Sequence, residues 1–179
     1  MENAGARKIS ASEHSETVSL MILKHAAEEH RHAYYLKKQL DRIVPGICAT
    51  YAREALIAPA ESCSYLNMLD VLTSRYLKQE IGITGMDLRF AAYLFVTYAI
   101  ELRADGLYPL YQLELSHVQH KVTVKSIILE EAGHLEEMII QLAHFSADWQ
   151  THAAVIIDIE HRLFTKWIAA MQKAVTEQL

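Results

Sequence analysis

The chain has 179 residues, 51% of them hydrophobic and 22% charged, which is typical of a soluble globular protein large enough to bury a core. Its formal net charge of −5 argues against general nucleic-acid binding, because that function needs a basic surface. The sequence holds no run of about 18 apolar residues and no basic-then-apolar leader, so it predicts neither membrane spanning nor secretion. Cys48 and Cys63 lack the spacing of a metal site or a disulfide framework, and a cytoplasmic location is therefore expected.

Apolar residues recur at helical spacing along most of the chain, and only 6 Gly and 3 Pro interrupt them, so we expect an all-α protein. Residues 1–12 are polar and are expected to form a flexible N-terminal tail. Residues 13–179 are expected to form a single helical-bundle domain. The predicted helices cover residues 13–43, 47–58, 61–78, 86–116, 121–145 and 146–175.

Two details of these helices have alternatives. Ser10 fits a capping box for the first helix, and Ser12 is the other candidate for its cap. In the helix over 86–116, Gly106 and Pro109 are expected to kink the run rather than to end it. A break at Asp105-Gly106 is the competing interpretation.

Two of the expected helices carry the pattern Glu-x-x-His on their apolar sides. The pairs are Glu29 with His32 and Glu131 with His134. Residues three apart on a helix lie on one face, so the carboxylate and the imidazole of each pair can bind the same metal ion. A buried Glu is costly unless something compensates its charge, and a metal cation would do so. The competing interpretation is a solvated surface pair at helical spacing.

Two further carboxylates are expected at the height of these pairs, because residues equidistant from a turn lie level with one another in antiparallel helices. A turn near residues 117–118 places Glu101 level with Glu131. A turn near Ser146 does the same for Glu160. The predicted metal ligands are therefore Glu29, His32, Glu101, Glu131, His134 and Glu160. Four carboxylates and two imidazoles suit iron or manganese, and also zinc.

This set of residues resembles the ferritin-like di-iron carboxylate proteins, whose bundles carry a Glu on each of two helices and Glu-x-x-His on each of the other two. The resemblance is carried by Glu101 and by the runs Ala27-Glu28-Glu29-His30-Arg31-His32-Ala33 and Ile128-Leu129-Glu130-Glu131-Ala132-Gly133-His134-Leu135. The family order is Glu, Glu-x-x-His, Glu, Glu-x-x-His, and here the first Glu helix is missing. We therefore assign the fourth carboxylate to Glu160, with Glu61 as the rival.

The resemblance implies a ferritin-like up-down bundle of four core helices plus an extra helical segment. It also implies two iron ions, with manganese or an iron–manganese pair as variants, that react with dioxygen and oxidise a small organic substrate. It assigns no catalytic residue beyond the metal ligands and leaves the electron donor open. Some members of this family act on large substrates such as tRNA, but the net charge of this chain does not favour such a partner, and the lack of a long apolar run argues against a membrane. Exposed apolar faces would allow a homodimer.

Two other functions remain open. A ferroxidase or iron-handling protein would use the same ligands, whereas a metal-free helical interaction module would use none of them. Two residues also have simpler interpretations. Glu160 can pair with a basic side chain such as His152, and His25, one turn from Glu29, is expected to be a hydrogen-bonded core residue rather than a ligand.

Overall fold

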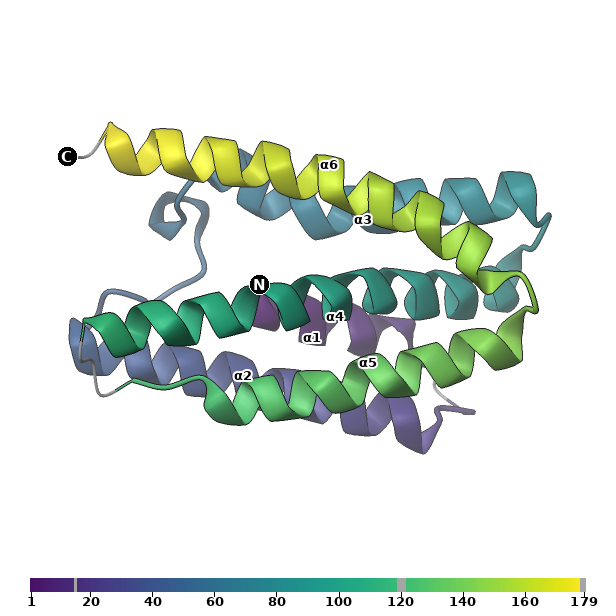
Figure 1. Cartoon of the computed structure of the whole chain (residues 1–179), viewed down its shortest axis with the longest axis horizontal. Helices are drawn as coiled ribbons and strands as arrows, with labels where there is room; N and C mark the ends of the chain where they lie inside the picture. Colours follow the sequence, from purple (N-terminus) through teal and green to yellow (C-terminus); the bar gives the residue numbers. More distant parts are fainter. Residues whose placement is uncertain (15, 119–121, 178–179) are drawn as a thin grey trace. The chain divides into compact units, whose positions relative to one another are not determined.

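The computed structural model describes residues 1–14, 16–118 and 122–177, and these residues form helices and no strand (Figure 1). The helices are α1 (Glu2–Ser12), α2 (Leu20–Ile43), η1 (Arg53–Ala55, a 3-10 helix), α3 (Pro59–Glu80), α4 (Gly85–His117), α5 (Lys125–Phe145) and α6 (Trp149–Thr176). The prediction of an all-α protein is confirmed, and the ferritin-like bundle of four core helices stays a prediction. In the part of the chain described, no helix is both long enough and apolar enough to cross a membrane.

The chain divides into two compact units. Unit 1 comprises Met1–Arg75 and Asp158–Leu179, and unit 2 comprises Tyr76–Ile157. Unit 1 therefore holds α1, α2, η1 and the larger parts of α3 and α6, whereas unit 2 holds α4, α5 and the remaining ends of α3 and α6. The single domain expected over residues 13–179 stays a prediction.

Helix α1 lies where the polar sequence predicts a flexible tail over residues 1–12. Ala6 and Ile9 are buried, and α1 packs on α2 (Figure 1). Lys8 adds an ion pair of 2.8 Å with Asp70 of α3. Ala6 and Ile9 give only a weak hydrophobic signal within a polar stretch of sequence. Packed against α2, they nevertheless hold α1 in place.

Helix α2 begins at Leu20, seven residues after the predicted start. Its cap is Ser19, whose hydroxyl accepts a hydrogen bond from a backbone N–H of the first turn at 3.3 Å. The predicted caps Ser10 and Ser12 are therefore wrong for this helix. Ser12 lies at the end of α1, where its hydroxyl donates a hydrogen bond to a backbone carbonyl.

The short helix predicted over residues 47–58 is reduced to the single turn of η1. The Thr50 hydroxyl accepts the N–H of Ala52 at 3.2 Å, a local bond that competes with helical hydrogen bonding. Ala58 has a positive φ of 46°, a conformation that interrupts a right-handed helix. Helix α3 then starts at Pro59, because proline is well suited to the first turn of a helix.

Helix α4 runs without interruption through Gly106 and Pro109. The alternative of a break at Asp105-Gly106 is therefore wrong. The predicted start of the next helix at Lys121, and part of the predicted turn at residues 116–120, lie outside the described residues.

The entry to α5 is held by a side chain of α4. The Gln112 side-chain oxygen accepts the Val124 N–H at 2.9 Å and the Thr123 hydroxyl at 2.8 Å. The backbone N–H groups at the start of a helix have no partner within it. The Gln112 side chain accepts a hydrogen bond from one such group, the N–H of Val124, directly before α5. Helix α5 therefore begins at Lys125 at a fixed position along α4.

Helices α4 and α5 run side by side in opposite directions and form the core of unit 2 (Figure 1). Leu94 on α4 and Ile127, Met138 and Leu142 on α5 are at most 2% exposed. The Phe95 ring also packs edge-on against the ring of Phe145, with centroids 6.1 Å apart. Polar side chains on the same faces of α4 and α5 are thereby brought into an apolar environment.

The packing of α1 can be tested at its most buried large side chain. Ile9→Ala should lower the free energy of unfolding by about 2 kcal/mol, because Ile9 is 7% exposed and the substitution removes buried methyl groups. Urea denaturation followed by helical circular dichroism measures the change. The exposed neighbour provides the control, since Ser10→Ala should change stability by less than about 0.5 kcal/mol. Equal stability of the two variants would contradict the docking of α1.

Candidate metal centre

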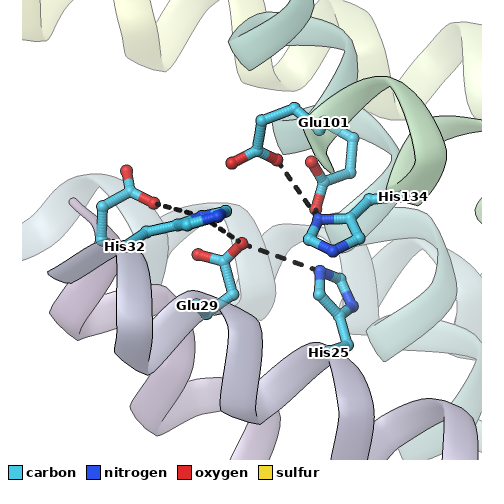
Figure 2. A network of polar contacts seen from close by, with 7 residues as sticks. His25, Glu29, His32, Glu101 and His134 are labelled. Carbon is cyan, nitrogen blue, oxygen red and sulfur yellow. Dashed lines mark hydrogen bonds and ion pairs between the residues drawn. The ribbon is translucent and has the colours of Figure 1, made fainter. Parts of the chain in front are cut away.

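In each unit, buried Glu and His side chains lie close to one another, and they are residues of the kind that can hold a metal ion (Figure 2). We define the unit 1 cluster by its His–Glu contacts, which join Glu2 on α1 with His25, Glu29 and His32 on α2. The unit 2 cluster is defined in the same way and joins Glu101 on α4 with Glu131 and His134 on α5. Apart from Glu2, whose side chain is 15% exposed, every member is at most 7% exposed.

The unit 1 cluster is centred on the carboxylate of Glu29, which Figure 2 shows between the rings of His25 and His32. Its Oε1 lies 3.6 Å from His32 Nδ1 and 3.9 Å from His25 Nε2. These three residues are spaced four and three apart, so one face of α2 presents them together. Glu2 of α1 approaches the same His32 Nδ1 with its Oε2, at 3.8 Å.

The unit 2 cluster is centred on the imidazole of His134. Its Nδ1 lies 3.4 Å from Glu131 Oε2, three residues earlier on α5, and 3.8 Å from Glu101 Oε1 on α4. The structure therefore brings Glu101 to this Glu-x-x-His pair, as a turn near residues 117–118 requires. Ligation of a metal by these residues stays a prediction.

The spacing of these atoms suits the ligands of a metal ion. Zinc holds N and O ligands at about 2.1 Å, which places neighbouring ligand atoms of one ion about 3.0–3.4 Å apart. The N···O distances given above run from 3.4 to 3.9 Å, a little longer than that spacing. Small side-chain rotations would close the remaining gap.

Charge compensation is the main energetic demand of both clusters. Each holds two carboxylates, and taking an ionised carboxylate out of water costs several kcal/mol even after the protein has relaxed around it. In each cluster both carboxylates approach the Nδ1 atom of a single imidazole. A divalent cation at the same place would compensate both carboxylates and would use the imidazole as a neutral ligand.

Glu160, the remaining predicted ligand, lies on α6 in unit 1 and is 2% exposed. The Tyr65 hydroxyl of α3 donates a hydrogen bond of 2.5 Å to Glu160 Oε1. The Tyr65 ring stacks on Trp167 with centroids 5.1 Å apart. Among the described residues neither metal-binding group includes Glu160, nor does either include Glu61, which is half-buried in the first turn of α3.

His152, the basic residue considered as a partner of Glu160, lies in a separate group of polar side chains in unit 2. The Tyr76 hydroxyl lies 2.9 Å from His152 Nδ1, and His152 Nε2 lies 3.5 Å from a carboxylate oxygen of Asp148. Burial raises the pKa of Tyr76, and the charges of Glu80 and Asp148 raise it further. The pKa of Asp148 is lowered, first by the hydrogen bond that the Ser146 hydroxyl donates to it. These contacts join α3 to α6 and give His152 partners other than Glu160. The pairing of Glu160 with His152 stays a prediction.

No protein-family model, no curated protein and no solved structure matches this chain. Metal binding is therefore inferred from the geometry and the chemistry of the two clusters themselves. The ferritin-like resemblance stays a prediction that rests on the Glu-x-x-His runs.

Glu2 is the cluster member that the sequence did not single out. A signal for it exists, because Glu2, Ala6 and Ile9 are spaced four and three apart and so share one helical stripe. The same stripe is buried in α1. Reading that stripe as a short amphipathic helix would have placed Glu2 on its inner face.

The hydrogen bond to Glu160 can be tested by removing its donor. Tyr65→Phe should lower the free energy of unfolding by about 1–3 kcal/mol, because a buried carboxylate loses a hydrogen bond that its charge strengthens. Urea denaturation measures the difference. Tyr111→Phe, which removes an exposed hydroxyl from α4, is the matched control and should be within about 0.5 kcal/mol of wild type. Two variants of equal stability would show that this bond contributes little.

Gly133 lies in the interior of α5 between Glu131 and His134, and a Cβ there would meet no atom within 4 Å. Gly133→Ala should therefore raise the free energy of unfolding by about 0.5–1 kcal/mol, since alanine restricts the unfolded chain and fits a helix. Metal content should stay at the wild-type level because the methyl group touches no ligand. Gly106→Ala, in equally open space on α4, is the comparison for the stability effect. A destabilised Gly133→Ala protein would contradict the helical backbone at this position.

Proposed function

We propose that the chain is a non-haem di-metal carboxylate oxidoreductase that activates dioxygen to oxidise a small organic substrate. The observation that carries the proposal is the burial of both Glu-x-x-His pairs, each with a further Glu oxygen 3.8 Å from its His Nδ1. Glu is rarely buried unless a partner compensates its charge. The proposed ligands are those that the sequence predicts, namely Glu29, His32, Glu101, Glu131, His134 and Glu160.

The donor atoms support iron as the metal, with manganese or an iron–manganese pair as variants. Carboxylate oxygens and imidazole nitrogens suit these ions and provide no soft sulfur ligand. Two ferrous ions would supply two of the four electrons that reduce dioxygen, and the oxidised substrate would supply the other two. That all six residues would hold the ions is part of the proposal and follows the ferritin-like pattern.

The protein's own contribution is to fix the ligands and to exclude water from them. Helix α2 holds Glu29 and His32 one turn apart, and their low exposure strengthens every electrostatic interaction around them. In unit 2 the pairing of α4 with α5 holds Glu101 beside His134. The Tyr65 hydroxyl would orient the Glu160 carboxylate, as groups behind metal ligands commonly do. A cytoplasmic location and a homodimer belong to the same proposal.

Metal content tests this proposal directly. Wild-type protein loaded with Fe²⁺ under anaerobic conditions and then desalted should carry about two ions per chain, as measured by mass spectrometry. Glu131→Ala should carry markedly fewer, because it removes a buried carboxylate ligand. Glu136→Ala removes an exposed carboxylate from the same helix and should keep the wild-type content. Equal iron in the Glu131→Ala and wild-type proteins would refute the assignment.

Ferroxidase or iron-handling activity is the second candidate, because it would use the same buried carboxylates and imidazoles. A storage protein assembles into a large hollow shell, whereas an oxidase of this size elutes from gel filtration as a monomer or a dimer. A metal-free interaction module is disfavoured because six Glu and His side chains of the two clusters are buried, namely His25, Glu29, His32, Glu101, Glu131 and His134. Such a module would keep its melting temperature when chelator is added, whereas loss of a bound metal lowers it.

A further inference from the structure

The two clusters share one local construction. In each, a helix supplies a Glu, and the next helix along the chain, packed against the first, supplies Glu-x-x-His. In unit 2, His134 Nδ1 lies 3.4 Å from the Glu of its own pair and 3.8 Å from Glu101. In unit 1, His32 Nδ1 lies 3.6 Å from the Glu of its own pair and 3.8 Å from Glu2. Glu2 therefore approaches His32 in the same way that Glu101 approaches His134.

We propose that Glu2 is a metal ligand and that it holds, together with Glu29 and His32, a divalent first-row ion. This inference rests on the proposed metal-binding function and adds a ligand that the sequence pattern does not assign. Each of the three residues offers one atom, and these atoms lie within 4.8 Å of one another. A carboxylate from α1 gives this site the same donors that Glu101, Glu131 and His134 give in unit 2.

The close approach of α1 to α2 supports this role. A Cβ built on Gly5 would lie 3.6 Å from Glu29 Oε2, so the α1 backbone passes directly over the carboxylate of the cluster. The Glu2 side chain is only 15% exposed, although it stands in the first turn of its helix. A Glu that served only to interact with the helix dipole would gain nothing by leaving water.

A consequence for α1 follows from its size. Isolated helices shorter than about 12–15 residues are marginal in water, and α1 has 11 residues. Ala6, Ile9 and the Lys8–Asp70 ion pair hold it on its neighbours. A ligand on this helix couples metal binding to its docking, because whichever of the two events occurs first makes the other more favourable. Metal binding therefore protects α1 from local unfolding.

The test uses the full-length, metal-free chain and Mn²⁺, which avoids reaction with dioxygen. Calorimetric titration gives the affinity, and hydrogen exchange measured by mass spectrometry follows the amides of residues 2–12. In wild-type protein Mn²⁺ should slow exchange in α1. Glu2→Gln should weaken Mn²⁺ binding at least about tenfold and should abolish the slowing of exchange. Exchange in α5 without metal should match wild type, which shows that the variant folds.

Two controls separate ligation from other roles of Glu2. The double variant Glu2→Gln/Asn3→Asp keeps an acidic residue in the first turn of α1, so it should behave like Glu2→Gln if Glu2 binds metal. Recovery of the wild-type affinity in this double variant would overturn the inference in favour of a helix-dipole role. Glu16→Gln removes an exposed carboxylate between α1 and α2 and should behave as wild type.

The remaining outcomes distinguish this inference from the function on which it rests. Equal Mn²⁺ affinities of the wild-type and Glu2→Gln proteins would overturn the role of Glu2 and would leave the proposed function in place. A wild-type chain that binds neither Mn²⁺ nor Fe²⁺ would overturn both.

Discussion

An imidazole nitrogen that faces two largely buried carboxylates is the constraint on which each unit depends. The carboxylates come from different helices, so the arrangement exists only where α1 packs on α2 and where α4 packs on α5. Buried acidic groups lower the stability of a core unless they are compensated, and the surrounding apolar residues must offset that cost. Ile127, Met138 and Leu142 on α5 are almost completely buried on either side of Glu131 and His134. A fold that accepts this cost in its interior is typical of a functional site, where local rules of stability are broken for chemistry.

Local spacing explains what the sequence could predict. The inward positions of Glu29, His32, Glu131 and His134 follow from helical periodicity, and the structure buries all four. The approach of Glu101 to His134 follows from a turn near residues 117–118, since antiparallel helices of known turn position have a defined register. Each of these inferences needs only one helix or one helix pair.

Tertiary contacts explain what the sequence could not predict. Helix α1 is polar on average and is fixed by Ala6 and Ile9 on α2, so the helix and its Glu2 depend on a neighbour. Glu160 accepts a hydrogen bond from Tyr65, 95 positions earlier in the chain, and no spacing rule joins residues so far apart. Between α2 and α3 the conformation depends on local side-chain hydrogen bonds such as the one that Thr50 accepts. Hydrophobic periodicity gives no information about such bonds.

Pro109 gives α4 a property that the other long helices lack. Proline has no N–H, so the carbonyl of Asp105 has no partner one turn later within the helix, and water can solvate it because both residues are exposed. Pro109 lies eight residues beyond Glu101, which is more than two helical turns from the contact of Glu101 with His134. Substitutions or insertions in the last turns of α4 can therefore redirect that end of the helix while Glu101 keeps its position. The far end of α4 is therefore a part of this helix whose shape can change without moving Glu101.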